Sequence, residues 1–136
     1  MDDRIKKYLQ KNKLLSWAMQ DEDGVYCANA FYAFDEKNLS LIIASHTNTK
    51  HIKLAKIKPK VSVNIAKLSK IPLLQGVQIQ AFFSKAKQEQ IELYYKRFPF
   101  AKIQNGTCFA LRIEYVKFTD NALLGKKLEF SLETRD

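Results

Sequence analysis

The chain has 136 residues, of which 46% are hydrophobic and 27% are charged, and its net charge is +9 at pH 7. This length predicts a single domain, residues 1–136, with enough apolar side chains to bury a core. No run of about eighteen apolar residues is present, and the segment MDDRIKKYLQ lacks the apolar stretch of a secretory signal. Neither a membrane-spanning nor a secreted protein is therefore expected, and the expected location is the cytoplasm.

The first half of the chain reads as a helix, three strands and a second helix. Apolar residues at helical spacing predict a helix over residues 3–11. The turn sequences DEDG and DEKN separate apolar runs that predict strands at residues 14–19, 25–34 and 39–44. A short basic helix is expected at residues 52–57, because Pro59 prevents it from continuing.

The second half alternates between apolar and polar residues in the manner of strands. Strands are expected at residues 61–66, 77–83, 109–115 and 128–132, and a helix at 88–98. The apolar face changes at Val116 and Phe118, which predicts a β-bulge. Six or seven strands with short connections and three short helices favour a mainly β, antiparallel barrel. Side chains fill a barrel of this size, so a ligand is expected at its rim or between subunits.

Positive charge is concentrated in one part of the chain. Between Lys37 and Gln88 there are ten lysines and neither aspartate nor glutamate. Such a field attracts phosphate-bearing partners. Charge alone leaves open nucleic acid, a phosphorylated small ligand, and a solvated surface with no dedicated ligand. No Phe, Tyr or Trp lies between residues 45 and 70. This disfavours single-stranded nucleic acid, whose bases usually stack on aromatic rings.

The turn between the expected strand at 39–44 and the basic helix is a candidate anion site. It contains hydroxyl and cationic side chains: Ser45, His46, Thr47, Thr49, Lys50 and His51. The first N–H groups of a helix lack backbone partners, and the helix dipole favours negative charge there. The turn is therefore expected to bind an anion such as phosphate.

Other reactive groups are few. Cys27 and Cys108 lie in strand-like patterns outside any CxxC motif, so two buried free thiols are expected. His46 and His51 have no cluster of carboxylates near them in the sequence, so no metal site is expected. The chain has no Ser-His-Asp motif and no Gly-rich phosphate loop. No catalytic residue is therefore assigned.

Five segments resemble the YhbP-like (UPF0306-type) family: VYCANAFYAFD, TKHIKLAKIKPKVSVNIA, LLQGVQIQ, YYKRFPFAK and EYVKFTDNALLGKK. The resemblance covers roughly Leu9 to Phe130, and KFTDN followed by GKK is its most specific part. The family is similar to the pyridoxamine 5'-phosphate oxidase-like split barrels. This implies a six-stranded antiparallel split β-barrel that forms a homodimer. It also implies non-covalent FMN in a groove between the subunits and an oxidoreductase with a small-molecule substrate of unknown identity.

The resemblance implies a role for the 45–51 turn. In the superfamily a hydroxyl followed by two cations, ten residues ahead of a proline, holds the FMN phosphate. Thr49, Lys50 and His51 occupy these positions here, and Pro59 follows Thr49 by ten residues. His51 departs from the pattern, because a histidine is mostly neutral at pH 7. Phosphate binding is therefore expected to be weaker, or to depend more on Lys50 and neighbouring lysines.

Further cofactor contacts are implied elsewhere in the chain. The candidates are Asn29, Ala30, Ser45, Thr47, Gln75, Gly76 and Gln78. For Asn29, pairing with backbone at a bulge is an equal alternative to a flavin contact. For Gln78, a solvent-facing strand position is the commoner case. The family-specific Lys126 and Lys127 are hypothesised to reach the phosphate, from the same subunit or from a second one.

The resemblance also indicates which activity is not expected and which alternatives stay open. A true pyridoxamine-phosphate oxidase is not expected, because those enzymes carry a C-terminal Trp followed by an Arg-Leu-x-Pro segment, whereas this chain ends LEFSLETRD. Two alternatives to an FMN-dependent oxidoreductase remain. One is a non-catalytic module for a flavin or for haem, with His46 or His51 as the axial ligand. The other is a basic barrel that binds nucleic acid, which ranks below FMN. No membrane partner is expected.

Overall fold

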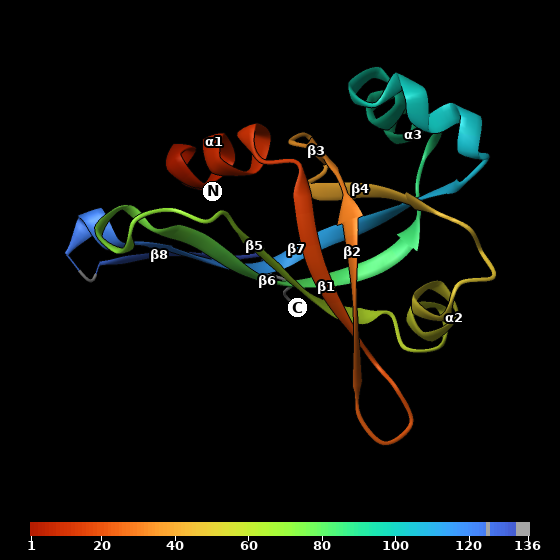
Figure 1. Cartoon of the computed structure of the whole chain (residues 1–136), viewed down its shortest axis with the longest axis horizontal. Helices are drawn as coiled ribbons and strands as arrows, with labels where there is room; N and C mark the ends of the chain where they lie inside the picture. The colour runs from red at the N-terminus through yellow and green to blue at the C-terminus, as the bar shows by residue number, and fades with distance from the viewer. Residues whose placement is uncertain (125, 133–136) are drawn as a thin grey trace.

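The computed structural model describes residues 1–124 and 126–132, which form one curled antiparallel β-sheet with three α-helices around it (Figure 1). The strands are β1 (Leu14–Gln20), β2 (Val25–Phe31), β3 (Ala33–Asp35), β4 (Ser40–Ser45), β5 (Lys60–Ala66), β6 (Gln75–Lys85), β7 (Thr107–Asp120) and β8 (Lys127–Ser131). The α-helices are α1 (Asp3–Lys11), α2 (Lys50–Ile57) and α3 (Gln88–Arg97). Three short 3-10 helices are η1 (Ile71–Leu73), η2 (Pro99–Gln104) and η3 (Asn121–Leu123). The predicted mainly β fold with short helices is confirmed.

The order of the strands explains why the sheet curls. The order is β2-β1-β5-β6-β7-β4-β3, and β8 pairs with β7 outside this path. β2 and β3 therefore lie at the two ends of this path, although only Tyr32 separates them in the chain. The sheet must curl until its edges approach each other at Tyr32, which gives the half-barrel shape of a split barrel.

At Tyr32 the structure differs from one predicted strand. The sequence predicts a single strand over residues 25–34, whereas the structure has two strands with different partners, since β2 pairs with β1 and β3 with β4. The Tyr32 ring is fully buried, and its hydroxyl donates to the carbonyl oxygen of Leu9 at 2.7 Å. Burying this ring directs the chain from one edge of the sheet to the other. The described residues therefore form eight strands rather than the predicted six or seven.

A β-bulge lies where β6 pairs with β7. Gln80 pairs with Tyr115 and Ala81 pairs with Ile113, so Glu114 has no partner in the register. The side of β7 that faces the core changes at this residue, and the Tyr115 hydroxyl consequently points outward. The predicted bulge is confirmed, but it lies earlier in the strand than the sequence indicates.

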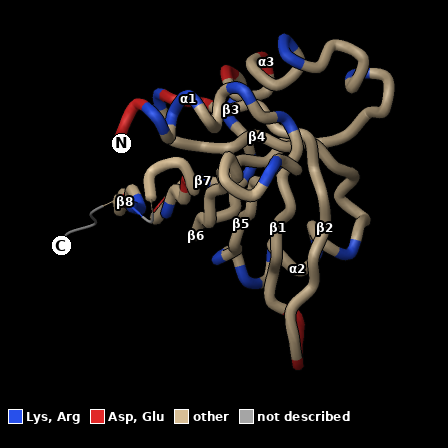
Figure 2. The backbone as a smooth tube through the Cα atoms, turned by 60° about the vertical axis from the view of Figure 1, so that its left-hand side comes forward, with Lys and Arg blue, Asp and Glu red and all other residues tan. Residues whose placement is uncertain are grey.

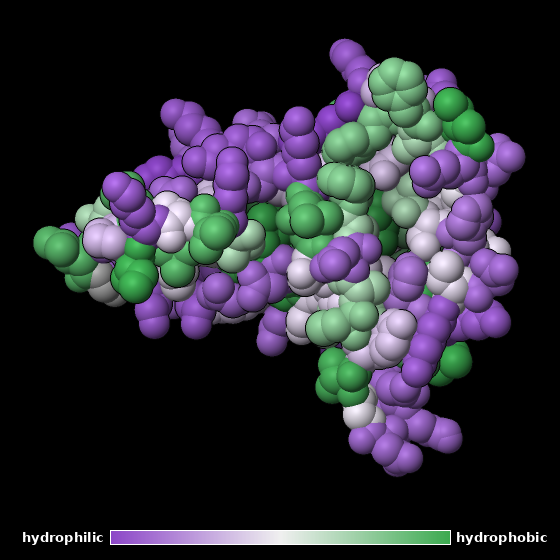
Figure 3. All heavy atoms as spheres, viewed as in Figure 1, coloured by the Kyte–Doolittle hydropathy of each residue, from purple (hydrophilic) through white to green (hydrophobic). Residues whose placement is uncertain are grey.

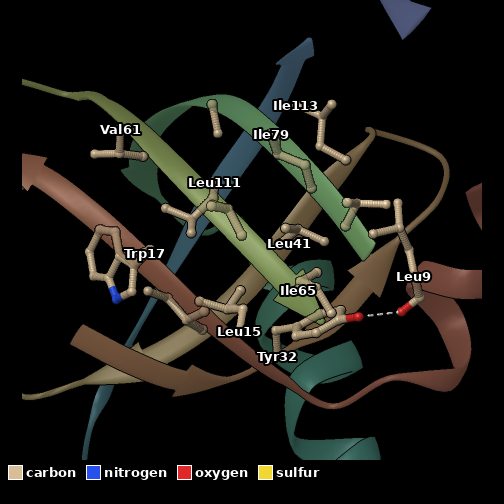
Figure 4. Close-up of a cluster of buried hydrophobic side chains, with 14 of the residues drawn as sticks. Leu9, Leu15, Trp17, Tyr32, Leu41, Val61, Ile65, Ile79, Leu111 and Ile113 are labelled. Atoms are coloured by element: carbon tan, nitrogen blue, oxygen red, sulfur yellow. Dashed lines mark hydrogen bonds between the residues drawn. The ribbon is translucent and has the colours of Figure 1, made fainter. Parts of the chain in front are cut away.

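The hydrophobic core fills the inner side of the curled sheet (Figure 4). Trp17, Phe83 and Phe109 stack in a row, with successive ring centroids 5.9 and 4.9 Å apart. Helix α1 covers one end of this core, where its Ile5 and Leu9 side chains are fully buried. Burying an aliphatic or aromatic side chain contributes roughly 1.5–3 kcal/mol. The apolar face of α1 therefore holds the helix against the sheet.

A protruding arm forms where β6 begins and β7 ends. It comprises residues 67–76, 117–124 and 126–131 and includes η1, η3 and β8 (Figure 1). Leu68, Ile71 and Leu124 expose 97%, 79% and 94% of their surface. Figure 3 shows hydrophobic residues gathered at this end, with hydrophilic ones around them. An exposed aliphatic cluster of this kind is typical of a surface that contacts a partner.

The turn between β1 and β2 is acidic. Asp21, Glu22 and Asp23 lie together there, where the turn projects from the body, while the lysines are distributed over the rest of the chain together with the other acidic residues (Figure 2). Among the described residues, no helix combines the length and the apolar character that a membrane crossing requires.

Candidate functional site

Helix α2 begins at the predicted anion turn, and its first residue is Lys50, two residues earlier than the sequence indicates. Thr49 is the N-cap residue, but its side chain makes no capping hydrogen bond to the first turn. Instead, the Thr49 hydroxyl donates to the carbonyl oxygen of His46 at 2.9 Å. The first N–H groups of α2 therefore lack a side-chain cap, and the helix dipole makes this end electropositive.

Three side chains of the turn meet at one point. His51 Nε2 lies 2.8 Å from Ser45 Oγ and 3.3 Å from Thr49 Oγ1, and the two hydroxyl oxygens are 3.5 Å apart. Ser45 ends β4, whereas Thr49 and His51 start α2, so the junction of strand and helix creates this cluster. The structure thus brings together Ser45, Thr49 and His51 of the predicted phosphate site. Thr47 lies in the same turn and is exposed.

His51 is a hydrogen-bonding group rather than a second permanent cation. Its ring packs edge-on against Trp17, with the ring centroids 5.7 Å apart. Burial lowers the pKa of His51 below its ordinary value, so the imidazole is neutral at pH 7. The Trp17 Nε1 atom beside it is buried and has no hydrogen-bond acceptor among the described residues.

Lys50 is the permanent cation of the predicted phosphate site, and it has contacts that the sequence analysis missed. Its Nζ atom lies 3.5 Å from Asp21 Oδ2 and 4.6 Å from the centroid of the Tyr26 ring. The side chains of Lys50 and Asp21 are 56% and 37% exposed, so the ion pair is weak and Lys50 can turn toward a ligand. The sequence does show the acidic turn before β2, which could have suggested a partner for Lys50. Only the folded structure places that turn beside α2.

A shallow hollow of about 340 Å³ lies on the outer side of the sheet. Its lining comes from β1, β2, β5, β6 and β7: Ser16, Trp17, Ala18, Cys27, Ser62, Val63, Asn64, Gln78, Ile79, Gln80, Tyr115 and Lys117. Lys117 supplies the one charge in this lining. A broad, flat and nearly uncharged sheet surface has the composition of the centre of a protein–protein interface. We refer to it as the sheet face.

Cys27, Asn29 and Gln78 all lie on or beside the sheet face. Cys27 is exposed, which contradicts the prediction of two buried thiols, because Cys27 shares the outward side of β2 with Asn29. Cys108 is buried, and both thiols are free, as predicted. Asn29 Oδ1 accepts a hydrogen bond from the Ser16 hydroxyl at 3.0 Å, within a regular β1–β2 pairing that has no bulge. Ala30 is half-buried, on the opposite side of β2.

The remaining predicted site residues lie on the arm. Gln75 Nε2 donates to Asp120 Oδ2 at 2.9 Å, and Gly76 is buried where β6 begins. Lys126 and Lys127 are exposed near the end of the arm. β5 leads away from α2 and pairs Ala66 with Gly76, so its seven residues separate the two regions by roughly 20 Å. A single chain therefore does not bring the arm residues to the 45–51 turn.

A metal centre has no support among the described residues, since no three His, Cys, Asp or Glu side chains form a group that could hold an ion. His46 is exposed at the turn, and His51 is engaged by Ser45. The donors that the turn offers are hydroxyls, a lysine, a neutral imidazole and helix N–H groups. This set suits an anion rather than a metal cation.

Comparisons with known proteins agree with this description. No family model matches the chain. The chain is 55% identical over 132 residues to a UPF0306 protein of Campylobacter jejuni, and the match covers 96% of this chain and 98% of that protein. It is 31% identical over 130 residues to the UPF0306 protein YhbP of Escherichia coli, with 91% and 88% covered.

Solved structures share the fold at low sequence identity. An FAD-binding protein of Mesorhizobium loti matches with a TM-score of 0.74 and 16% identity over 87% of this chain and 92% of that one. A heme-binding protein of Mycobacterium smegmatis matches with a TM-score of 0.75 and 11% identity, covering 88% and 53%. HutZ, the heme storage protein of Vibrio cholerae, matches with a TM-score of 0.66 and 17% identity, covering 83% and 89%. These likenesses confirm the split-barrel class.

Proposed function

The chain belongs to the UPF0306 family, and we propose that it is an FMN-binding protein that works as a homodimer. The FAD-binding and heme-binding proteins with the same fold support a cofactor-binding module. Within that class we propose a flavin, with its phosphate in the 45–51 turn. The function that follows is an oxidoreductase whose substrate is a small molecule.

The observation that carries this proposal is the cluster of donors at the start of α2. Ser45 and Thr49 place two hydroxyl oxygens 3.5 Å apart, beside a helix N-terminus that has no side-chain cap. Lys50 adds a positive charge that its weak pair with Asp21 leaves available. A phosphate monoester needs several donors and positive charge at short range, and this turn offers both.

The proposed dimer forms through the sheet face. Small and amide side chains such as Ser62 and Asn64 cover the face, and a second copy can approach it closely without burying many charges. Packing two such faces would also exclude water from a groove at their border. Gln78 on this face and Asn29 beside it would then contact a ring that lies in the groove.

The protein would bind, orient and shield the cofactor, while the bound FMN would supply the capacity for hydride and electron transfer. Hydroxyl and amide groups hold the phosphate and the edge of the ring. The described part of the turn contains no carboxylate suited to acid–base work. The proposed role of the chain is therefore positioning and exclusion of water, rather than proton transfer.

A binding titration tests the proposal. The purified protein is titrated with FMN and, in parallel, with riboflavin, which has the same ring and no phosphate. FMN is expected to bind more tightly than riboflavin. Replacing Thr49 with Ala and Lys50 with Gln should reduce that difference, by about tenfold if roughly 1.4 kcal/mol of phosphate interaction is lost. Equal affinity for the two ligands would contradict a phosphate site in this turn.

Haem is the second candidate, and the exposed His46 is the observation that favours it. An imidazole at the rim of the turn is a possible axial ligand, whereas His51 already contacts Ser45. The visible spectrum separates the two candidates, because a flavin absorbs near ~450 nm and haem has a sharp Soret band. If FMN binds, anaerobic mixing with NADH and NADPH then tests for reductase activity.

A further inference from the structure

We infer that the hollow between α3 and η2 is a second ligand site, which binds a small aromatic carboxylic acid. The lining of this hollow includes no residue of the 45–51 turn and none of the sheet face. Figure 1 shows α3 and α2 on opposite sides of β4. The site is therefore separate from the proposed FMN site, and the inference goes beyond the proposed function.

The hollow exists because α3 uses only one of its faces to pack on the sheet. Gln90 and Tyr94 are buried on that face. The residues of the neighbouring face recur at helical spacing and line a hollow of about 640 Å³: Gln88, Ile91, Glu92, Tyr95 and Lys96. The other wall is the end of η2 and the residues after it: Lys102, Asn105 and Gly106. Sites for small molecules usually have volumes of about 300–1,000 Å³, and this hollow lies in that range.

Hydrogen bonds and close packing fix the two walls relative to each other. The Tyr95 hydroxyl donates to the carbonyl oxygen of Gly106 at 3.4 Å, which joins α3 to the other wall. Asn105 ends η2 in the left-handed conformation, with a φ of 53°. Gly106 packs against the end of β4, where a Cβ atom would lie 3.4 Å from the backbone nitrogen of Ser45. Such preformed walls reduce the entropy that a ligand loses on binding.

The charges of the lining favour an anion with one negative charge. Lys96 comes from α3 and Lys102 from η2, so each wall carries one ammonium group. In the described part of the chain, neither lysine forms an ion pair with a carboxylate. Glu92 accepts a hydrogen bond from the Gln88 amide at 3.3 Å, and together with the two lysines it leaves a net charge of +1. One carboxylate neutralises this charge and has an oxygen for each ammonium group.

The apolar part of the lining indicates what the carboxylate is attached to. Ile91 and Tyr95 are half-buried and pack against the cluster that contains Cys108. The Lys102 ammonium lies 5.8 Å from the centroid of the Tyr95 ring, so an acid bound to Lys102 has its body close to that ring. A flat aromatic body gains from contact with an aromatic side chain in addition to burying apolar area. An aromatic acid therefore fits the lining better than a free inorganic anion does.

A titration followed by nuclear magnetic resonance tests the site in the whole chain, without FMN. The isotope-labelled protein is titrated with 2-naphthoate and, in parallel, with 2-naphthamide, which has the same rings and no charge. The amide signals of Asn105 and Gly106 are expected to shift and saturate with naphthoate. Naphthamide should bind about tenfold more weakly, because it forms no ion pair with the lysines. Equal affinities, or no saturable shift of these two signals, would overturn the inference.

A pair of charge variants tests the role of the two lysines. Lys96→Gln/Lys102→Gln should bind naphthoate about tenfold more weakly and naphthamide as well as the wild type does. The matched control is Lys37→Gln/Lys67→Gln, which removes two exposed lysines outside the hollow. The same weakening in the control would contradict the inference, since net charge alone would then explain it.

Two further probes test the aromatic body of the ligand. Decahydro-2-naphthoate has the same carbon skeleton without the flat rings, and it should bind about threefold to tenfold more weakly than naphthoate. Inorganic phosphate has charge and no apolar body, and it should bind more weakly still. If either probe binds at the same signals as tightly as naphthoate, the site does not select an aromatic acid and the inference is wrong.

The FMN titration separates this inference from the proposed function. Lys96→Gln/Lys102→Gln should keep the preference of the wild type for FMN over riboflavin, because neither lysine belongs to the 45–51 turn. Loss of that preference in the variant would show that the two sites are one, which overturns the inference. A wild-type protein that binds naphthoate as expected and does not distinguish FMN from riboflavin would contradict the proposed function alone.

Discussion

His51 illustrates how burial changes the meaning of a residue in a motif. The family resemblance implies a permanent cation at its position, but its ring packs on Trp17 and its Nε2 atom contacts Ser45. Desolvation disfavours the imidazolium form, so the pKa of His51 lies below the ordinary value. The residue therefore supplies a hydrogen bond at neutral pH, and the positive charge must come from elsewhere.

The affinity for FMN is expected to increase as the pH falls from about 8 to 6.5, over the range in which the phosphate remains mostly dianionic. A dianion beside the Ser45–His51 pair would favour the imidazolium form, so binding takes up a proton. The measurement is the FMN dissociation constant as a function of pH, with riboflavin as the control ligand. The variant His51→Gln should show little of this dependence, and an equal dependence in both proteins would contradict the role given to His51.

The stability of the ligand-free protein should also depend on His51. The pKa of this residue is lower in the folded state than the unfolded value of about 6.5. The unfolded state consequently binds a proton first, and the free energy of unfolding falls as the pH decreases below about 6.5 toward the folded pKa. Urea denaturation at several pH values should show a smaller decrease for His51→Gln than for the wild type. Parallel curves would exclude this contribution.

Gln90 and Asp35 form a buried polar contact that the sequence does not indicate. Gln90 Nε2 donates to Asp35 Oδ2 at 2.9 Å, and both residues are over nine-tenths buried. Burial raises the pKa of Asp35, but hydrogen bonds from Asn38 and Gln90 outweigh it and the net pKa is lowered. This contact fixes the start of α3 against the end of β3.

Replacing Gln90 with Leu should destabilise the fold by about 1–3 kcal/mol, because the Asp35 carboxylate would lose one of its donors in a buried position. Chemical denaturation measures the change. Gln88→Leu is the matched control, since Gln88 is exposed on the same helix and should change stability by less than about 0.5 kcal/mol. Similar losses in both variants would contradict the importance of the Asp35 contact.

Among the elements, α3 packs its buried Tyr94 against the sheet and is held at its end by hydrogen bonds from its last residue, Arg97. The Arg97 guanidinium donates to the carbonyl oxygens of Tyr32, Gln10 and Asn12, at 3.1, 3.1 and 2.9 Å. These acceptors belong to the corner between β2 and β3, to the last turn of α1 and to the connection from α1 to β1. One planar cation therefore joins three separate segments where the edges of the sheet approach each other.

Arg97→Lys should lower stability by about 1.5–3 kcal/mol, because an ammonium group cannot reach all three carbonyl oxygens with the fixed geometry of a guanidinium. The thermal unfolding midpoint is the measurement. Lys96→Ala, at the exposed neighbouring position, is the control and should have little effect. A fully stable Arg97→Lys protein would show that charge alone holds these segments together.

The sheet face is the surface through which we propose that two copies of the chain associate. Asn64 lies near its centre, is exposed, and pairs in register with Gln78. Two copies related by a two-fold axis through this face would place their centres against each other. A charge introduced there would be buried without a partner, at a cost of several kcal/mol.

Asn64→Arg is therefore expected to convert the proposed dimer to a monomer, as measured by light scattering after size-exclusion chromatography. FMN affinity should fall in parallel, since the proposed groove between the two copies would be lost. Gln88→Arg adds the same charge to the exposed face of α3 and should leave the dimer intact. A dimeric Asn64→Arg protein would show that association uses another surface.

Much of the fold could be read from the order of apolar and polar residues. Period-2 alternation located β5 and β6, and helical spacing located α1, because each of these elements buries one face and exposes the other. The hydroxyl and cationic residues of the 45–51 turn were identified for a similar local reason. A strand that leads directly into a helix leaves unpaired N–H groups at the junction.

Other features depended on contacts between distant segments. The division of the 25–34 strand follows from the burial of Tyr32 between two sheet edges, and the altered character of His51 follows from its packing on Trp17. The pairing of Lys50 with Asp21 and the separation of the arm from the turn are also products of the folded chain. A sequence pattern shows which residues of a single helix or strand are buried. The solvation of a side chain such as His51, its ion pairs and its distance from other segments depend on which elements pack together.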